Sequence, residues 1–134
     1  MEYTRDKFII TDDRNKVQIN EVHRLLRDSY WASDRDKDTI KTTIENSVCF
    51  SLFTNGKQIG FARVVTDFAS VAYLADVIID SYYRRQGLGK WLLETVLNDP
   101  RWSSKFKFLA TDDAHKLYEK YGFSGSNKLM STAI

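Results

Sequence analysis

The sequence is poor in the residues that hold small proteins together through cross-links or metal ions. Cys49 is the only cysteine, so no disulfide can form within the chain. With only two histidines, His23 and His115, a zinc site with several ligands would have to rely on carboxylates. We therefore expect neither a disulfide framework nor a bound metal.

Long apolar runs and a strong charge of either sign are also missing. No stretch approaches the ~18 uninterrupted apolar residues of a membrane span, and the first seven residues carry four charges. Twenty Lys and Arg against eighteen Asp and Glu give a net charge of only +2. That balance is too weak to predict the basic surface that dominates duplex binding. The sequence predicts no membrane segment, no nucleic-acid partner and a cytoplasmic protein.

What is present describes an ordinary globular domain. The chain has 134 residues, and at roughly 100–200 residues per domain this length predicts a single domain over residues 1–134. Hydrophobic residues make up 43% and charged residues 28%, a balance that argues against disorder and low-complexity architectures.

The spacing of apolar residues predicts a strand, two helices, three strands, a helix, a strand and a helix. Asp12–Asn15 supplies turn and cap chemistry before a helical stripe of Ile19, Val22, His23 and Leu26. Asn55-Gly56 is typical of a type I′ hairpin turn. Strands are expected at 8–11, from 48, at 57–66, 71–79 and 106–110, and the later helices at 38–46, 88–96 and 114–121. This order predicts a mixed α/β fold, a central sheet with helices on its faces.

Two of the helix ends carry their own signals. Asn98-Asp99-Pro100 is expected to stop the helix at 88–96. Asp112 or Asp113 is the expected N-cap of the last helix, and Gly122 the residue that ends it.

The most informative segment is Asp80–Lys90, between an apolar strand and an amphipathic helix. Gly87 and Gly89 let the backbone approach a ligand closely. The N–H groups of the helix's first turn have no acceptor within the helix and can bind a ligand at its N-terminus. Arg84, Arg85 and Lys90 add positive charge where the helix dipole already favours an anion. The spacing fits neither the P-loop nor the dinucleotide fingerprint. The alternative is a tight connection with exposed arginines.

This segment resembles the GNAT superfamily of N-acetyltransferases, whose signature [R/Q]-x-x-G-x-[G/A] is matched by Arg84–Gly89. Ala114–Phe123 is similar to the family's A-x-x-x-Y-x-x-x-G-F element, and the likeness spans roughly 8–123. The chain resembles one group of small GNAT proteins more closely, at Tyr30-Trp31-Ala32, Gly60–Asp67 and Thr111-x-Asp113-Ala114-His115.

The resemblance implies a mixed, mostly antiparallel sheet and acetyl-CoA bound in a V-shaped opening between the strands at 71–79 and 106–110. Main-chain groups of Val77, Ile78 and Ile79 would bond the pantetheine arm, which would lie along the sheet like an added strand. The residues expected around the pyrophosphate are Arg84, Arg85, Gln86, Gly87, Leu88, Gly89 and Lys90.

The resemblance also implies a catalytic acid at Tyr118 and an oxyanion donor on the main chain near Val77. A phenol with a pKa near ~10 can protonate a thiolate whose conjugate acid lies near ~8.5 only if the two are close and aligned. The alternative role of Tyr118 is core packing with Leu117 and Tyr121.

Asp76 is the candidate general base, since it is the one charged residue in the strand 71–79. A buried, unpaired carboxylate has a raised pKa that would suit a base. If the strands pair so that residue numbers sum to 139, however, Arg63 lies opposite Asp76 and the two form a structural ion pair.

The chain departs from the family at the base. Some GNAT enzymes carry a catalytic glutamate one place before Asp76, where this chain has Ala75. A water chain ending on Asp76, Asp67 or His115 is the alternative route for the proton. The same departure motivates a second function, a non-catalytic module that binds CoA or an acyl-CoA. Binding of inorganic phosphate alone is a third.

The acceptor is expected to be a primary amine of a small molecule or a peptide. Aromatic side chains could hold its ammonium by cation–π attraction, and Arg35 could pair with a carboxylate on it. The residues expected to bind the acceptor are Tyr30, Trp31, Arg35, Phe68 and Tyr73. The alternative is that they only pack in the core or line the rim of the site. The tail 124–134 could add an edge strand within the chain or to a second copy, and many members of the family form homodimers.

Overall fold

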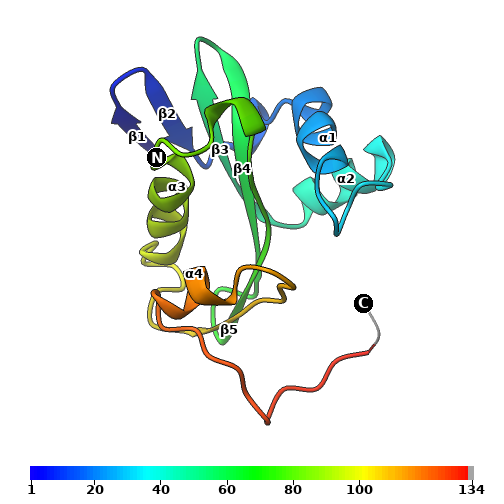
Figure 1. The fold of residues 1–134 in the computed structure, drawn as a ribbon, viewed down its shortest axis with the longest axis vertical. Helices are drawn as coiled ribbons and strands as arrows, with labels where there is room; N and C mark the ends of the chain where they lie inside the picture. Colours follow the sequence, from blue (N-terminus) through cyan, green and yellow to red (C-terminus); the bar gives the residue numbers. More distant parts are fainter. Residues whose placement is uncertain (133–134) are drawn as a thin grey trace.

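The computed structural model describes residues 1–132 and contains a six-stranded sheet with helices on both faces (Figure 1). The strands are β1 (Glu2–Arg5), β2 (Phe8–Thr11), β3 (Val48–Thr54), β4 (Lys57–Thr66), β5 (Val71–Ile79) and β6 (Phe106–Phe108). The helices are α1 (Ile19–Arg27), α2 (Lys37–Glu45), α3 (Leu88–Leu97) and α4 (His115–Glu119), with short 3-10 turns η1 (Arg14–Lys16) and η2 (Ser81–Tyr83). The strands lie in sequence order, antiparallel except for β6, which runs parallel to β5. This confirms the predicted mixed, mostly antiparallel α/β fold.

The strands follow the alternation in the sequence closely. The predictions at Phe8–Thr11, Lys57–Thr66 and Val71–Ile79 are confirmed to the residue. Asn55 and Gly56 have φ of +50° and +76°, as a type I′ turn requires, and join β3 to β4. The last strand ends at Phe108 rather than at Ala110, because its pairing with β5 stops there.

β1 is a strand that the sequence did not predict. Its four residues, Glu2–Arg5, are all exposed, so neither face carries the apolar alternation that reveals a half-buried strand. Its pairing with β2 is a hairpin that turns at Asp6, whose φ is +53°.

The capping predictions for the first helix and the last helix were wrong. Asp13 caps η1, accepting the N–H of Asn15, whereas α1 begins after Gln18 without a side-chain cap. At α4 the N-cap is Ala114 rather than Asp112 or Asp113.

The turn before α4 explains that difference, and α4 ends at Glu119 with Lys120 as its C-cap, two residues before the predicted end at Tyr121. The hydroxyl of Thr111 accepts the Ala114 N–H at 3.1 Å, so the chain is already turned before the helix starts. At the other end Gly122 has φ +90°, and the N–H of Phe123 donates to the Tyr118 carbonyl at 3.2 Å.

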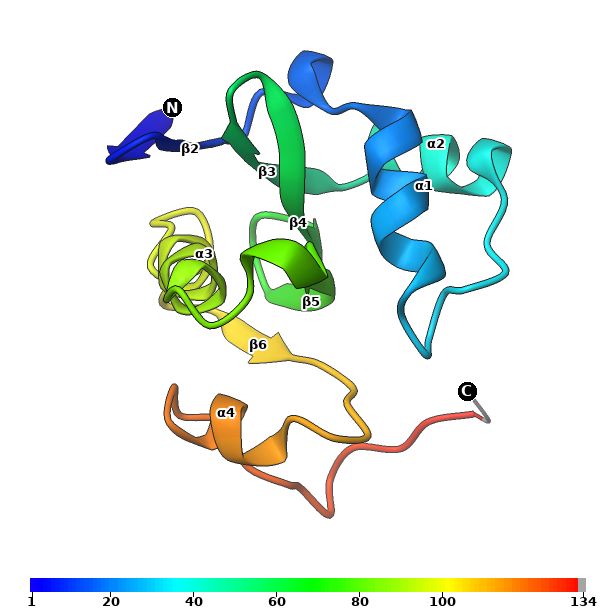
Figure 2. The ribbon, with the colours of Figure 1, turned by 45° about the horizontal axis from the view of Figure 1, so that its top comes forward.

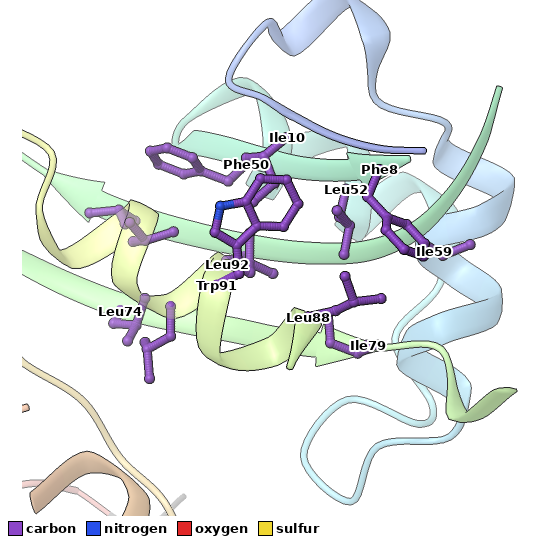
Figure 3. Close-up of a cluster of buried hydrophobic side chains, with 14 of the residues drawn as sticks. Phe8, Ile10, Phe50, Leu52, Ile59, Leu74, Ile79, Leu88, Trp91 and Leu92 are labelled. Atoms are coloured by element: carbon purple, nitrogen blue, oxygen red, sulfur yellow. The ribbon is translucent and has the colours of Figure 1, made fainter. Parts of the chain in front are cut away.

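Apolar side chains form a core on each face of the sheet. Trp91, Leu92 and other residues of α3 pack against one face (Figure 3). Val22, Leu25 and Leu26 of α1 pack on the other, with α2 beside them (Figure 2). The α3 core also contains Phe8, Ile10, Phe50, Leu52, Ala62, Val64, Ala72, Leu74 and Ile79, and the α1–α2 core Ile40, Ile44, Cys49, Phe61 and Ile78. His23, expected on the buried stripe of α1, is only half-buried.

The tail from Ser124 adds no strand over residues 124–132. Residues 133 and 134, part of the tail expected to pair with the sheet, lie outside the described residues. Within residues 1–132, no helix has the length and apolar character needed to span a bilayer, and no group of three or more His, Cys, Asp or Glu side chains is arranged to hold a metal ion.

Gly60 on β4 tests how tightly the sheet packs beneath α3. A Cβ at this position would lie 2.9 Å from Ile79 Cδ1 and 3.0 Å from Leu52 Cβ. We expect Gly60→Ala to lower the free energy of unfolding by about 1–3 kcal/mol through overpacking. Urea denaturation followed by tryptophan fluorescence measures the change. Gly125→Ala, where an added Cβ has nothing within 4 Å, is the matched control. Equal stability of the two variants would contradict the prediction.

Candidate active site

β5 and β6 run side by side only over their first three residues. Their pairing begins at Val71 and Phe106 and ends at Tyr73 and Phe108. Beyond this last pair β5 continues to Ile79, while the chain leaves β6 for the loop before α4. One edge of β5, from Leu74 to Ile79, therefore has no strand paired with it, and we refer to the side of the sheet where β5 and β6 part as the opening.

The pairing of β5 with β4 decides which main-chain groups face this opening. The N–H of Asp80 donates to the Ile59 carbonyl at 2.7 Å, so residues 80 and 59 form a hydrogen-bonded pair. Because such pairs alternate along an antiparallel ladder, Ile78 faces β4, and the N–H and C=O of Ile79 face away from it. The side chain of Arg84 agrees, since its Nε donates to the Ile79 carbonyl at 3.0 Å.

The loop after β5 presents a row of N–H groups at the start of α3. Arg85 and Gly87 have φ of +65° and +81°, and the first helical hydrogen bond runs from the Trp91 N–H to the Gly87 carbonyl. Among the described residues, the main-chain N–H groups from Arg85 to Lys90 have no hydrogen-bond acceptor. At Gly89 an added Cβ would meet nothing closer than Ile79 Cγ1 at 3.6 Å, so packing inside the protein does not require glycine there.

The basic side chains of this loop are placed differently from one another. Arg84, Arg85 and Lys90 are all exposed, but Arg84 is held in place because its Nε donates to the Ile79 carbonyl. Lys90 Nζ lies 3.9 Å from the Glu94 carboxylate one turn along α3, a solvent-screened contact. The loop therefore offers positive charge together with N–H donors, the combination that favours a phosphate.

Asp80 is a positioning residue that sequence reasoning left unassigned. Its Oδ1 accepts the Tyr82 N–H at 3.0 Å and so starts the turn that leads to Gly87. Its Oδ2 lies 2.9 Å from Nη2 of Arg24 on α1, an ion pair that ties the loop to the opposite face of the sheet. The signal in the sequence was an aspartate directly after an apolar strand, a common start of an Asx turn.

A β-bulge in β5 interrupts the register next to the opening. Residue numbers of paired positions sum to 139 at Gly60–Ile79 and Phe61–Ile78 but to 138 at Arg63–Ala75. One residue of β4 thus faces two of β5, and one of these two, Asp76, has φ +53°. Arg63 therefore pairs with Ala75 rather than with Asp76. The predicted register was wrong here because it did not include the bulge.

The expected ion pair nevertheless forms, because the bulge turns the Asp76 side chain toward Arg63. The carboxylate of Asp76, 3% exposed, accepts three hydrogen bonds: from Arg63 Nε at 2.9 Å, Arg35 Nη1 at 2.8 Å and Trp31 Nε1 at 2.8 Å. Burial alone would raise the pKa of Asp76, but the charge and hydrogen bond of Arg63, with Arg35 and Trp31, hold that pKa below its ordinary value. The pKa of Asp76 is thus lowered, not raised as expected of a general base. The geometry favours the alternative, a structural ion pair with Arg63.

The connection between α1 and α2 reaches both sides of the opening. Trp31 and Arg35 bind Asp76 on β5, and Tyr30 stacks edge-on against Trp31 with ring centroids 5.1 Å apart. The hydroxyl oxygen of Tyr30 accepts the N–H of Asp112, in the loop after β6, at 2.8 Å. Residues 30–35 therefore form a bridge across the splayed strands.

Tyr118 on α4 is half-buried and packs edge-on against Phe123 with ring centroids 5.8 Å apart. Its hydroxyl makes no hydrogen bond within the described residues. Burial raises the pKa of Tyr118, and the nearby Tyr30 and Asp113 raise it further. The phenol is thus protonated at neutral pH and available as a donor.

The structure brings together most, but not all, of the expected acceptor residues. Tyr30, Trp31 and Arg35 converge on the bridge, and Tyr73 lies at the last pair of β5 and β6. Phe68 lies in the turn before β5, beyond Val71, and the five residue-to-residue steps from Val71 to Asp76 alone span about 16 Å. It is therefore remote from the bridge.

Asp67 and His115 are the two other residues at which a water chain was expected to end, and the structure shows where each lies. Asp67 closes the turn between β4 and β5, where it accepts the N–H groups of Ala69 and Ser70. The hydrogen bonds of Ser70, from its hydroxyl and its N–H, hold the pKa of Asp67 well below its ordinary range. His115 is exposed at the start of α4.

Replacing Asp76 by Asn tests its structural role, because Asn tolerates the left-handed conformation that Asp76 adopts. The change leaves Arg63 and Arg35 without a countercharge, and we expect the free energy of unfolding at pH 7 to fall by about 3 kcal/mol. Because the pKa of Asp76 is lower in the folded state, its contribution is complete above the unfolded value near ~3.9 and is lost as the pH falls through the lower folded value.

Urea denaturation between pH 7 and pH 3 gives the measurement. The difference between wild type and Asp76→Asn should stay constant down to about pH 5 and shrink below about pH 4. Asp34→Asn, which removes an exposed carboxylate from the same connection, is the control and should change little. A difference that is small at pH 7, or that grows toward acid, would refute the assignment.

Comparisons with known proteins bear on this geometry. The family described as Acetyltransferase (GNAT) domain matches residues 45–125. A candidate acetyltransferase from Gibberella zeae is 26% identical, over 90% of this chain and 81% of its own. The crystal structure of a candidate GNAT-family acetyltransferase from Xanthomonas campestris is 34% identical, with a TM-score of 0.90 over 98% of this chain and 96% of that one. A GNAT acetyltransferase from Elizabethkingia anophelis with acetyl-CoA bound shares the fold, at 19% identity and a TM-score of 0.69 over 92% of this chain and 80% of that one. This chain belongs to the GNAT acetyltransferase family.

Proposed function

We propose that the protein transfers an acetyl group from acetyl-CoA to the primary amine of a small molecule or peptide. The observation that carries the proposal is the row of unpaired N–H groups at the start of α3, directly beside the free edge of β5. Together they offer donors for a diphosphate and an extended edge for an amide-bearing arm. Coenzyme A contains both groups, a diphosphate and an amide-bearing pantetheine arm.

The coenzyme is assigned to the residues that surround the opening. Its pyrophosphate binds the N–H groups from Arg85 to Lys90, with the charges of Arg85 and Lys90 nearby. Its pantetheine arm follows the edge of β5, where the N–H of Ile79 and the groups of Val77 are the expected partners. The GNAT acetyltransferase of Elizabethkingia, which holds acetyl-CoA, supports this assignment through its shared fold.

The transfer proceeds by direct attack of the amine on the thioester. The lone pair of the neutral amine forms a C–N bond to the acetyl carbon, the C–S bond breaks, and the sulfur leaves as a thiolate. The acylated nitrogen releases one proton to solvent, from which Tyr118 is reprotonated after it protonates the thiolate. A main-chain N–H near Val77 stabilises the oxyanion. Cys49 offers no covalent alternative, because it lies in the α1–α2 core and burial raises the pKa of its thiol to about 11.

Tyr118 supplies the proton that the leaving thiolate takes up. Its hydroxyl is free of protein partners in the described residues, and its raised pKa keeps it protonated over the neutral range. A group that is protonated before the reaction and close to the opening can act as the general acid.

The amine loses its proton to solvent rather than to Asp76. The Asp76 carboxylate is committed to three donors, and its lowered pKa makes it a poor base. Arg63 and Arg35 exceed Asp76 by one positive charge, and a net positive charge on the acceptor face favours the neutral, reactive amine over the ammonium.

A non-catalytic module that binds CoA or an acyl-CoA is the second candidate. It is favoured by Ala75, where some relatives in the superfamily carry a glutamate, together with the structural commitment of Asp76. Both candidates bind the coenzyme, so only turnover separates them. Release of free thiol from acetyl-CoA in the presence of an amine panel supports the enzyme, whereas binding without release supports the module.

Gly89→Glu tests the phosphate cradle with opposite effects on stability and binding. An acidic side chain in the first turn of α3 interacts well with the helix dipole, so the free energy of unfolding should stay equal or rise slightly. The same charge repels the pyrophosphate, and the Kd for CoA, measured by calorimetry, should rise at least about tenfold. Gly125→Glu makes the same charge change in the tail, where an added Cβ has open space, and should leave the Kd unchanged. If Gly89→Glu binds CoA as tightly as the wild type does, the N–H groups at the start of α3 do not hold the pyrophosphate.

Tyr118→Phe tests the acid. It removes only the hydroxyl, so we expect kcat to fall by about 10²-fold or more while the Kd for CoA changes little. Tyr121→Phe is the matched control, because Tyr121 lies in the turn after the same helix and its hydroxyl bonds Glu94 at 3.2 Å instead. If both variants keep full kcat, or if Tyr118→Phe weakens binding as much as turnover, Tyr118 is a packing residue.

A further inference from the structure

α4 carries Tyr118, the proposed acid, but little in the helix itself holds it in place. It has five residues, His115–Glu119, none of them buried, and its N-cap Ala114 makes no side-chain hydrogen bond. A helix this short depends on tertiary contacts for its position. The placement of the Tyr118 phenol is therefore decided by the contacts of the chain on either side of α4.

The chain at the end of α4 is attached to α3. The rings of Tyr118 and Tyr121 pack against the α3 core, and the Tyr121 hydroxyl donates to Glu94 of α3 at 3.2 Å. Phe123 lies beyond the helix end, with its ring edge-on against Tyr118 at 5.8 Å. All of these contacts lie at or after Tyr118, so they do not fix the start of the helix.

The start of α4 is tied to the connection between α1 and α2 through Tyr30. The Asp112 N–H donates to the Tyr30 hydroxyl oxygen at 2.8 Å, and over residues 110–114 this is the only hydrogen bond to a distant part of the described chain. The Thr111 hydroxyl accepts the Ala114 N–H at 3.1 Å, so Asp112 lies inside a turn that leads directly into α4. Figure 2 shows the loop after β6 close to the α1–α2 connection. A displacement of Asp112 is therefore transmitted to the helix.

Tyr30 is in turn held by the bridge across the splayed strands. Its ring stacks edge-on against Trp31, whose Nε1 donates to the buried Asp76 carboxylate at 2.8 Å. The contacts thus run continuously from Asp76 through Trp31 and Tyr30 to Asp112. Burial and, after it, the nearby Tyr30 raise the pKa of Tyr118, which agrees with a position of Tyr30 beside the acid.

We propose that Tyr30 is a positioning residue for Tyr118: its hydroxyl holds the loop before α4 and thereby keeps the Tyr118 phenol at the opening. The proposal rests on the proposed acetyl transfer, in which Tyr118 is the acid. It gives Tyr30 a role other than the acceptor binding expected from the sequence. A general acid works only when it is close and aligned, so a loosened α4 slows transfer although every reacting group is present.

Tyr30→Phe removes the hydroxyl and keeps the ring beside Trp31. Tyr30 is 52% exposed, so the variant should fold as the wild type does. Thiol release at saturating acetyl-CoA, with the amine that reacts fastest in the panel, gives kcat and KM. We expect kcat to fall about fivefold, as for the loss of one neutral hydrogen bond, while the Kd for CoA changes less than about twofold.

A double-mutant cycle shows whether Tyr30 acts through Tyr118. In the Tyr118→Phe background the acid is absent, so adding Tyr30→Phe should lower the remaining kcat by less than about twofold. Tyr3→Phe is the matched control. It removes a hydroxyl that contacts Met1 on β1, at the far edge of the sheet, and should leave kcat unchanged in both backgrounds.

Amide hydrogen exchange measures the placement of α4 without turnover. The Tyr118 N–H donates to the Ala114 carbonyl at 3.2 Å, in the first turn of the helix. NMR of the coenzyme-free protein should show this amide exchanging about fivefold faster in Tyr30→Phe than in the wild type, because α4 opens more often. The amides of α3 serve as the internal reference and should exchange at unchanged rates.

The outcomes separate positioning from the transfer itself. An unchanged kcat in Tyr30→Phe, or a fall that is as large in the Tyr118→Phe background, overturns the proposal and leaves acetyl transfer intact. A higher KM for the amine at unchanged kcat assigns Tyr30 to acceptor binding and overturns it as well. If CoA binds but no amine reacts, or if Tyr118→Phe keeps full kcat, the proposed chemistry fails and amide exchange decides. Faster exchange at Tyr118 then supports positioning by Tyr30, and unchanged exchange overturns it.

Discussion

The Asp76 carboxylate lies almost fully buried in a bulge of β5, and an unpartnered carboxylate at such a place would cost several kcal/mol. Three side chains from two other parts of the chain remove that cost: Arg63 from β4, and Trp31 and Arg35 from the α1–α2 connection. Their convergence fixes the connection over the point where β5 and β6 separate. The shape of the acceptor side of the opening therefore depends on one buried charge.

A second ion pair links α1 to the loop that the proposed function assigns to the coenzyme. Arg24 on α1 reaches Asp80, which in turn orders η2 and the loop that leads to Gly87. α1 is thus attached to the loop proposed to hold the pyrophosphate and, through the connection after it, to the bulge at Asp76, on the proposed acceptor side. If transfer takes place as proposed, a helix attached to both proposed sites, directly through Arg24 and through the connection that follows it, keeps the two bound molecules in a constant relative position.

Local signals in the sequence predicted the parts of the fold that depend on neighbouring residues. The hairpin at Asn55-Gly56 follows from the positive φ that both positions need, and the strand at Val71–Ile79 from its apolar run. The bulge at Asp76 could not be predicted, because alternation continues through the sequence while one residue is inserted in the pairing. The ion pair with Arg63 was predicted and forms, although the register used to predict it was wrong by one residue. The hydrogen bond between Tyr30 and Asp112 joins residues 82 positions apart, and no local pattern reports it.

The two halves of the site differ in how they are encoded. In the proposed function, coenzyme recognition uses main-chain N–H groups of a glycine turn and the free edge of a strand, so any sequence that adopts this fold and keeps the glycines provides most of it. Family resemblance is therefore informative about acetyl-CoA. The proposed acceptor recognition uses side chains, those of the bridge held by Asp76. Side chains can change while the fold persists, so membership of the family leaves the acceptor open, and the chemistry of this chain's own side chains has to identify it.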